Sequence, residues 1–262
     1  MAAELLTHAH YAWLVVASLL AGVMNAMAGG GSFLSFPAML AMGVAPVQAN
    51  ATNTVAIWPG QLTSIFALRG DLRRDLLPAV SACAIVGGVG GAMLLLHTRQ
   101  TTFLRVLPWM LLLATVLFGV SGHISKWMQR RTQHSTSGRT ISTPILMGLL
   151  LPVCVYIGYF GAGAGFLIMA VLALLGVEEM HELNSMKILA ACLANLCAVI
   201  TFIANGAVVW HYCLIAMVFA AGGGYVGARY ARRLNPAVLR GVVVATGCGV
   251  AGWFFWIQRH GV

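Results

Sequence analysis

Residues 25–37 have the sequence Asn-Ala-Met-Ala-Gly-Gly-Gly-Ser-Phe-Leu-Ser-Phe-Pro, and this stretch decides how the chain is organised. The apolar run Tyr11–Ala28 before the glycines is long enough to cross a bilayer, whereas the run Phe33–Met42 after them is not. A membrane helix needs about 20 apolar residues to cross roughly 30 Å of hydrocarbon, and a ten-residue helix reaches only about 15 Å. The glycines therefore predict a break between a full span and a half-segment.

The same order returns in the second half of the chain. Residues 161–165, Gly-Ala-Gly-Ala-Gly, precede a second short apolar run, Phe166–Leu175. The matching stretches are residues 32–34 with 165–167, at an offset of 133, and residues 87–88 with 222–223, at an offset of 135. Duplicated halves with interrupted hydrophobic segments at corresponding places are the best sequence indication of a secondary transporter.

The composition assigns the chain to the membrane. Of the 262 residues, 60% are hydrophobic and only 8% are charged, with a mean hydropathy of +0.88. A soluble domain carries roughly 25% charged residues, so a soluble enzyme and a disordered chain are both excluded. The net charge of +9 comes from arginines that fall between apolar runs. Cytoplasmic loops concentrate such residues, so we attribute the basicity to membrane topology and expect no nucleic-acid partner.

The expected fold is an all-α membrane protein. It is a polytopic bundle of eight full spans and two short glycine-led half-segments, arranged as two homologous repeats. The eight runs of spanning length lie near residues 10–28, 50–68, 76–97, 103–122, 144–161, 186–205, 211–228 and 239–257. We predict a first membrane repeat at 1–122, a basic cytoplasmic connector at 123–142 and a second membrane repeat at 143–262.

The positions of the basic residues bear on whether the half-segments complete a crossing. Without a crossing, eight basic residues lie on one side of the membrane and seven on the other. With a crossing, one side holds twelve and the other holds only Arg99, Arg105 and Arg259. Because cytoplasmic loops are enriched in Lys and Arg, the second arrangement is favoured. It makes the repeats inverted and places both termini outside, although re-entrant half-segments stay open.

The first candidate site lies at the first break. Its residues are Asn25, Gly29, Gly30, Gly31 and Ser32. A helix that starts after Gly31 leaves its first N–H groups without partners and turns the positive end of its dipole toward the break. An anion would satisfy these donors, but close packing of helices through small residues explains the glycines equally well.

Four polar residues open the next long apolar run: Asn50, Thr52, Asn53 and Thr54. One Asn or Thr could cap a helix, but four polar residues within five positions exceed what capping needs. We therefore predict a binding or gating role for them.

The second candidate site combines Gly163 and Gly165 with Asn184, Lys187 and Asn195. At the offset of 133, Lys187 aligns with Thr54 of the polar cluster. A lysine at the centre of a membrane helix costs roughly 2.5–3.5 kcal/mol, which favours a role in binding a small anion. The alternative is an anchor whose ammonium group reaches the membrane surface.

Other chemistries find no support in the sequence. The six cysteines occur singly inside apolar runs, and neither CxxC pairs nor zinc-type Cys/His spacings occur. We therefore expect no metal and no cofactor. No HExxH motif, carboxylate pair or Ser/His/Asp arrangement lies within a span, so we predict no catalytic residues and no enzyme. No Asp or Glu lies well inside a span, which argues against a proton relay.

Two stretches, Asn25–Gly60 and Asn184–Arg240, closely resemble the sulfite exporter family called TauE/SafE. The second stretch includes Asn184-x-x-Lys187, Asn195, Phe202, Gly206, Trp210, residues 223–229, residues 231–234 and Leu239-Arg240. The resemblance covers nearly the whole chain. It implies a multi-pass transporter in the bacterial inner (plasma) membrane, of a family linked to the export of sulfite or organosulfonates.

We therefore expect an inner-membrane secondary transporter that exports a small anion, with the lipid bilayer and that anion as its partners. Moving one charge through 100 mV is worth about 2.3 kcal/mol, so a monoanion leaves a negative cytoplasm without a coupling ion. A channel or helper subunit without its own transport cycle is the first alternative. An intramembrane enzyme is the second.

Overall fold

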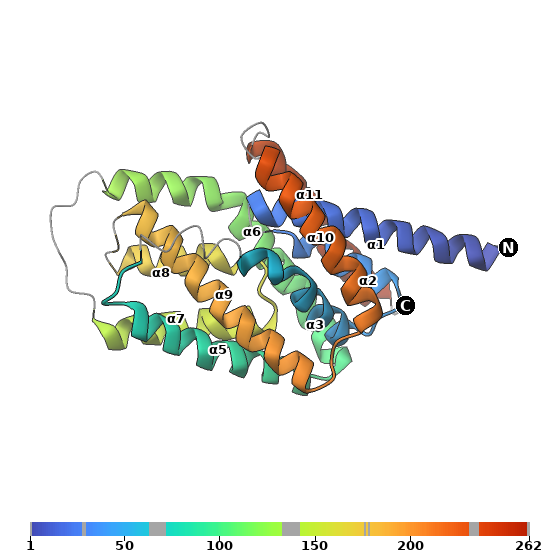
Figure 1. Cartoon of the computed structure of the whole chain (residues 1–262), viewed down its shortest axis with the longest axis horizontal. Coiled ribbons are helices and arrows are strands. Elements are labelled where there is room, and N and C mark those ends of the chain that lie inside the picture. The colour runs from blue at the N-terminus through green and yellow to red at the C-terminus, as the bar shows by residue number, and fades with distance from the viewer. Residues whose placement is uncertain are drawn as a thin grey trace.

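The fold is given by a computed structural model, which describes residues 2–27, 30–62, 72–132, 142–175, 177, 179–230 and 236–260 (Figure 1). All regular secondary structure within these ranges is helical. The expected all-α fold is therefore confirmed.

The helices follow the order of the predicted apolar runs. They are α1 (Ala2–Met27), α2 (Ser32–Ala41), α3 (Pro46–Ile57), α5 (Leu77–His97), α6 (Gln100–Thr132), α7 (Thr143–Tyr159), α8 (Ala164–Leu174), α9 (Met180–Ala204), α10 (Trp210–Tyr230) and α11 (Pro236–His260). The two half-segments are the short helices α2 and α8, of 10 and 11 residues.

Three stretches of helix in the described part of the chain are long and apolar enough to cross a membrane. They are Leu77–His97, Gln100–Leu117 and His181–Ala204. Four further apolar stretches of 10–17 residues are Ser32–Ala41, Thr143–Tyr159, Ala164–Leu174 and Val244–Trp256. These lengths and compositions support a membrane protein.

Small residues bring two pairs of helices into close contact. Helix α1 packs along α10, where a Cβ on Gly22 would overlap the carbonyl oxygen of Ala220. Helix α5 packs along α7 in the same way, since a Cβ on Gly158 would overlap the carbonyl oxygen of Gly88. Absent side chains let backbones approach closely, which is how membrane helices associate when apolar burial gives no driving force.

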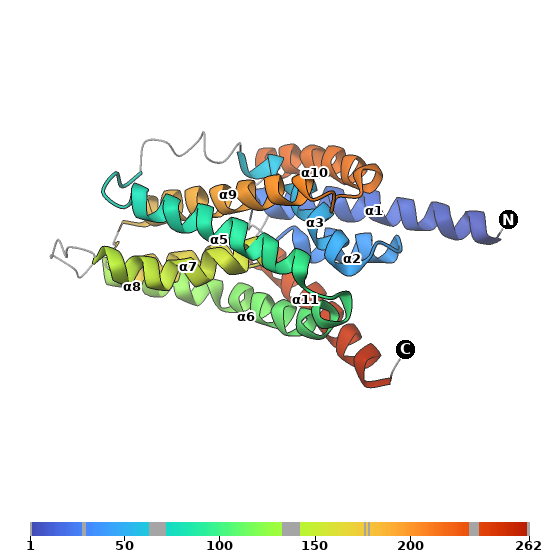
Figure 2. The same cartoon turned by 90° about the horizontal axis from the view of Figure 1, so that it is seen from below.

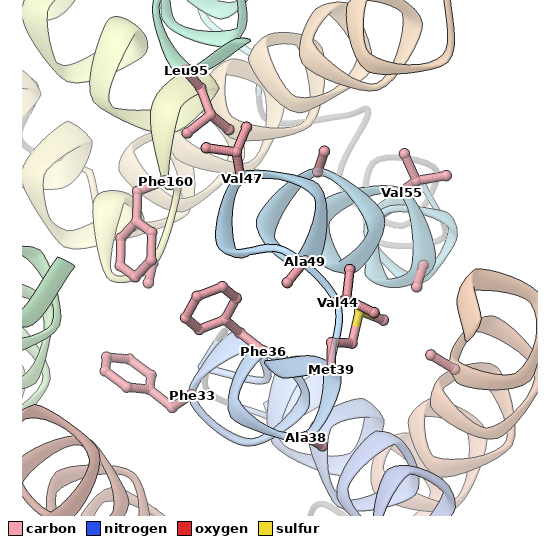
Figure 3. Packing of buried hydrophobic residues seen from close by; sticks show 14 of the residues in the cluster. Phe33, Phe36, Ala38, Met39, Val44, Val47, Ala49, Val55, Leu95 and Phe160 are labelled. Atoms are coloured by element: carbon pink, nitrogen blue, oxygen red, sulfur yellow. The ribbon is translucent and has the colours of Figure 1, made fainter. Parts of the chain in front are cut away.

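A buried apolar cluster surrounds α2 and α3. Figure 3 shows Phe36 of α2 directed toward Phe160, which follows α7, and Phe33 on the same side of α2. The rings of Phe36 and Phe160 meet edge to face with centroids 6.1 Å apart, a favoured geometry for aromatic pairs. The half-segment α2 is therefore held inside the bundle by both halves of the chain.

Two boundaries differ from the sequence-based expectation. The run 50–68 was expected to be one span, but α3 ends at Ile57 and Trp58 forms a turn before Pro59. Proline lacks the N–H that would continue the helical hydrogen bonds and clashes with the preceding turn. Helix α6 continues to Thr132, into the expected connector, because residues 123–132 contain no Pro or Gly to stop it. Residues 133–141 lie outside the described ranges.

Several helix ends lie at one or the other end of the longest axis of the molecule. The start of α1 and the end of α11 lie toward one end of this axis in both views (Figures 1 and 2). The end of α6 and the start of α7 lie toward the opposite end.

Candidate functional site

The first break is tightly built from backbone. Helix α2 begins at Ser32, and the N–H groups of Phe33 and Leu34 donate to the carbonyl oxygens of Gly30 and Gly31 at 3.2 and 3.0 Å. A Cβ on Gly31 would overlap the carbonyl oxygen of Ala21 in α1. The expectation that the first N–H groups of α2 lack partners is therefore wrong for Phe33 and Leu34, because the carbonyl oxygens of the break accept from them. At Gly31 the missing side chain serves close packing. Gly29 lies outside the described residues.

Asn25 lies beside this break. Its Cβ is 3.2 Å from the place a Cβ on Gly31 would take, and its Nδ2 is 3.9 Å from the corresponding place on Gly60. Asn25 thus lies between the start of α2 and Gly60, which is one of the helical residues that follow the turn at Trp58. Gly31 and Gly60 have no Cβ, so no side chain separates either backbone from Asn25.

The polar side chains of α3 are buried inside the bundle. Asn50, Thr52 and Asn53 are 2%, 0% and 1% exposed. Burying a polar side chain is costly unless it forms hydrogen bonds, so their partners define their role.

Each of the three buried side chains joins α3 to a different part of the fold. Asn50 Nδ2 donates to the Tyr159 carbonyl oxygen at 2.9 Å. Thr52 Oγ1 accepts from the Val209 N–H at 3.0 Å. Ser35 of α2 donates to Asn53 Oδ1 at 2.5 Å. These bonds link α3 to the end of α7, to the segment before α10 and to the first half-segment.

Thr54 differs from the other three. Its hydroxyl donates to the Asn50 carbonyl oxygen one turn earlier in α3, at 2.9 Å. This local bond satisfies the hydroxyl without a partner from another helix. Of the four polar residues, Thr54 is the one whose side-chain hydrogen bond stays within α3.

The second break is shaped by two glycines with left-handed backbone. Gly161 and Gly163 have φ of +78° and +74°, a region that residues with a Cβ rarely adopt. Tyr156 in α7 donates its hydroxyl to the Ala162 carbonyl oxygen at 2.8 Å, which fixes the loop. A Cβ on Gly163 would lie 3.2 Å from Cα of Ala114 in α6, so this turn also packs closely.

Lys187 lies against the start of the second half-segment. Its Cδ is 3.3 Å from the place a Cβ on Gly165 would take. Gly165 is the second residue of α8, so the lysine stem runs over the first turn of that helix. Within the described residues, Lys187 has no hydrogen-bond or ion-pair partner.

The nearest acidic side chain on α9 is engaged elsewhere. Glu182 lies near the start of α9, and its carboxylate is 4.0 Å from Nε of Arg73. Arg73 also binds Asp75, and this hydrogen bond lowers the pKa of the Asp75 carboxyl. Lys187 follows Glu182 by five residues, which is about 7.5 Å further along the helix.

The residues directly after α3 meet α9 at two hydrogen bonds that the sequence interpretation missed. Trp58 Nε1 donates to the Cys192 carbonyl oxygen at 3.3 Å, and Asn195 Nδ2 donates to Gln61 Oε1 at 3.1 Å. Each pair joins residues 134 positions apart. That spacing is close to the repeat offset, so comparison of the two halves could have singled out Gln61.

The structure therefore brings some candidates together and leaves others apart. It groups Asn25 with Gly31, Ser35 with Asn53, and Lys187 with Gly165. It places Asn195 at the contact between α3 and α9. Asn184 lies half-buried in the first turns of α9. Among the described residues, no hydrogen bond joins Lys187 to the α3 cluster.

The described side chains and backbone offer two kinds of group at the breaks: hydrogen-bonding groups and the ammonium group of Lys187. Within the described ranges, no group of three or more His, Cys, Asp and Glu side chains could hold a metal ion. The described cysteines are all free thiols. Helix starts, amide side chains and an ammonium group are what an anion needs.

Long apolar helices, two glycine-led half-segments inside the bundle and a lysine at one of them define a helical membrane protein of the transporter class. The chain belongs to the family described as Sulfite exporter TauE/SafE, which matches residues 14–254.

Curated relatives carry names of the same class. The chain is 29% identical over 245 residues to "Probable membrane transporter protein ORF9" of a Sinorhizobium species, a match that covers 92% of this chain and 90% of the relative. It is 26% identical to "Probable membrane transporter protein YfcA" of Escherichia coli K12, covering 83% and 77%. A "Probable membrane transporter protein" of Haemophilus influenzae is 25% identical, covering 86% of each chain. No solved structure matches the chain significantly.

Proposed function

We propose that this protein is a secondary transporter that exports a small anion, sulfite or an organosulfonate, across the bacterial inner membrane. The observation that carries the proposal is the position of Lys187 beside Gly165 at the start of α8. Family membership supports export of a sulfur oxyanion, since the family is described as a sulfite exporter family.

The contact between Lys187 and α8 favours an anion for an electrostatic reason. The N-terminus of a helix carries roughly half a positive charge from its aligned peptide dipoles. A lysine placed beside that end is destabilised by like-charge repulsion unless an anion lies near both groups. The N–H groups of Ala164 and Phe166 already donate to the Gly161 and Gly163 carbonyl oxygens. A small anion would therefore accept mainly from the ammonium group and be stabilised by the dipole of α8.

The driving force follows from the charge of the substrate. A monoanion that leaves a negative cytoplasm gains about 2.3 kcal/mol per 100 mV. All six acidic residues of the sequence lie outside the interiors of the predicted spans, at Glu4, Asp71, Asp75, Glu178, Glu179 and Glu182. The proposed cycle is therefore uniport-like efflux that uses the membrane potential and needs no proton relay.

The proposed architecture is two inverted repeats of five segments each. The pairs Trp58–Cys192 and Gln61–Asn195 join residues 134 positions apart. Two residues that a two-fold axis exchanges can contact each other only if both lie beside that axis. The axis of the proposed repeats therefore passes between α9 and the end of α3. The same operation exchanges the α1–α10 contact with the α7–α5 contact, which the fold shows as its two closest helix pairs.

The direction of the helices supports the inversion. Helix α1 begins at one end of the longest axis and α7 begins at the other (Figures 1 and 2). Repeats that start on opposite sides of a membrane are related by an axis in the membrane plane. An offset of 134 also makes Asn53 the counterpart of Lys187. The offset of 133 expected from the sequence makes the next residue, Thr54, its counterpart.

This architecture predicts that both termini are outside and that the connector is cytoplasmic. A green fluorescent protein fused after residue 130 should fluoresce, and alkaline phosphatase fused at the C-terminus should be active, because each reporter works on one side only. Phosphatase activity of a fusion after residue 130 would reject the inverted arrangement.

The proposed function is tested by anion efflux from liposomes that contain the purified protein. Sulfite, sulfate, thiosulfate, sulfoacetate and taurine are loaded in turn, and an inside-negative potential is set with valinomycin and potassium. Sulfite or one of the sulfonates should leave faster than from protein-free liposomes. Efflux that required a pH gradient at clamped voltage would overturn the uniport cycle, and equal rates with and without protein would overturn the function.

A further inference from the structure

The two half-sites are equivalent in fold but differ in charge. In the first half, Asn53 lies beside α2 and accepts the Ser35 hydroxyl, which also donates to the Gly31 carbonyl oxygen at 3.2 Å. In the second half, Lys187 lies beside α8 at Gly165. At the offset of 134 that separates Trp58 from Cys192 and Gln61 from Asn195, Lys187 corresponds to Asn53. At the offset of 133 that aligns the half-segments it corresponds to Thr54, so its counterpart is a neutral residue at either offset. One half-site therefore presents a neutral amide where the other presents an ammonium group.

Among the basic side chains that the structure describes, Lys187 is the one that lies at a break. Arg73 is occupied by Asp75 and Glu182 near the start of α9. Arg99 and Arg105 lie at or near the start of α6 with exposed side chains, and Arg229 is exposed in the last turn of α10. The polar side chains that face the breaks from α1 and α3, such as Asn25 and Asn50, are neutral.

We infer that the transported substrate is a monoanion, and that bisulfite and organosulfonates with a single negative charge are accepted while dianions such as sulfite, sulfate and sulfoacetate are rejected. This inference rests on the proposed function and specifies the charge of its substrate. A charge brought into a low-dielectric site costs several kcal/mol unless an opposite charge compensates it. One fixed ammonium compensates one negative charge, and a dianion would leave the second charge unpaired.

Competition in the proteoliposome assay tests the charge rule. Methanesulfonate is a monoanion at every accessible pH and sulfate is a dianion of similar size. The methanesulfonate concentration that halves the uptake of labelled substrate should be at least about tenfold lower than the sulfate concentration that does so. Sulfite itself should be transported less well as pH rises through the bisulfite–sulfite equilibrium, whereas methanesulfonate transport should stay level over the same range.

A charge-insertion variant makes the test independent of the substrate's own titration. Asn53→Lys adds a second ammonium group at the equivalent half-site and should narrow the methanesulfonate-to-sulfate preference by about tenfold or more. Asn205→Lys is the matched control, because Asn205 is exposed just after the last residue of α9 and lies 18 residues along the chain from Lys187. If Asn53→Lys fails to fold, Lys187→Gln gives the second test. Removal of the ammonium group should weaken inhibition by methanesulfonate at least about tenfold and should leave sulfate without measurable inhibition.

The outcomes separate this inference from the proposed function. Sulfate that competes as well as methanesulfonate in the wild-type protein would overturn the charge rule while anion transport stands. A sulfite transport rate that does not change with pH, while the methanesulfonate transport rate also stays constant, would overturn the charge rule as well. The absence of transport for every anion would instead overturn the proposed function.

Discussion

Lys187→Met is expected to raise the half-saturation concentration for the exported anion by more than about a hundredfold, while the protein still inserts and folds. Removing one partner of a buried charge pair costs about 3–5 kcal/mol, and each 1.4 kcal/mol is tenfold in affinity. Insertion should not suffer, because a lysine inside a span opposes insertion and methionine does not. Anion binding and efflux of the purified variant give the measurement.

The matched control for this variant is Lys126→Met, which removes the only other lysine of the sequence. Its transport should match the wild type, because residue 126 lies in the extension of α6 far from the glycine breaks in sequence. Normal half-saturation of Lys187→Met would show that the lysine is only an interfacial anchor. Lys187→Arg should restore transport partially at most, because a planar guanidinium fills the space over Gly165 differently.

A smaller change at the same contact tests the position of Lys187. Gly165→Ala places a Cβ 3.3 Å from Cδ of Lys187, which is tight enough to displace the flexible end of the side chain. We expect the half-saturation concentration to rise several-fold with thermal stability unchanged. Gly148→Ala in α7 adds a methyl group with no atom within 4 Å and is the control.

Gly223→Ala is expected to destabilise the protein by at least about 3 kcal/mol, or roughly 6–12 °C in Tm for a chain of this size. A Cβ at position 223 would overlap the Leu19 carbonyl oxygen, and backbone cannot move aside without separating α10 from α1. The neighbouring Gly222→Ala is the matched control, because a Cβ there meets no atom within 4 Å. Thermal unfolding in detergent, followed by size-exclusion chromatography, measures both.

The same experiment on α5 tests whether the two closest helix pairs are equivalent. A Cβ on Gly91 would overlap the Val155 carbonyl oxygen in α7, whereas a Cβ on Gly90 has open space. Gly91→Ala should therefore lose about as much stability as Gly223→Ala, and Gly90→Ala should lose little. Wild-type stability of both Gly91→Ala and Gly223→Ala would contradict the close packing that the fold shows.

The half-segments could be predicted because the sequence features that define them are local. The expected runs Phe33–Met42 and Phe166–Leu175 differ from α2 and α8 by one or two residues at each end. Glycine clusters interrupt a helix wherever they stand, and ten or eleven apolar residues are too few to cross a bilayer. Neither argument needs to know which other helix lies nearby.

The partners of the polar residues were not predictable, because they depend on which helices meet. Asn50 binds a carbonyl oxygen that is 109 positions away, and Thr52 binds an N–H that is 157 positions away. The four polar residues of α3 were expected to act as one cluster, but three of them join α3 to separate parts of the fold. Their number indicated an important helix without indicating which bonds each would make.

Some residues were missed although a signal was present. Gln61 follows Pro59 and Gly60 and lies 134 positions before Asn195, which the sequence did single out. The repeat offsets of 133 and 135 bracket this spacing and would have placed Gln61 within one position of Asn195. Pro59 was also a signal for the end of α3, but the apolar run around it was long enough to suggest an unbroken span.

The central claim, that this protein carries a small sulfur-containing monoanion, is tested most directly by counterflow. Liposomes with purified protein are loaded with unlabelled methanesulfonate or bisulfite, and a trace of the same labelled anion is added outside at zero voltage. The account predicts transient accumulation of label above equilibrium, absent in protein-free liposomes and strongly reduced for Lys187→Met. Label that only equilibrates would indicate a channel, and label that does not enter at all would contradict the account.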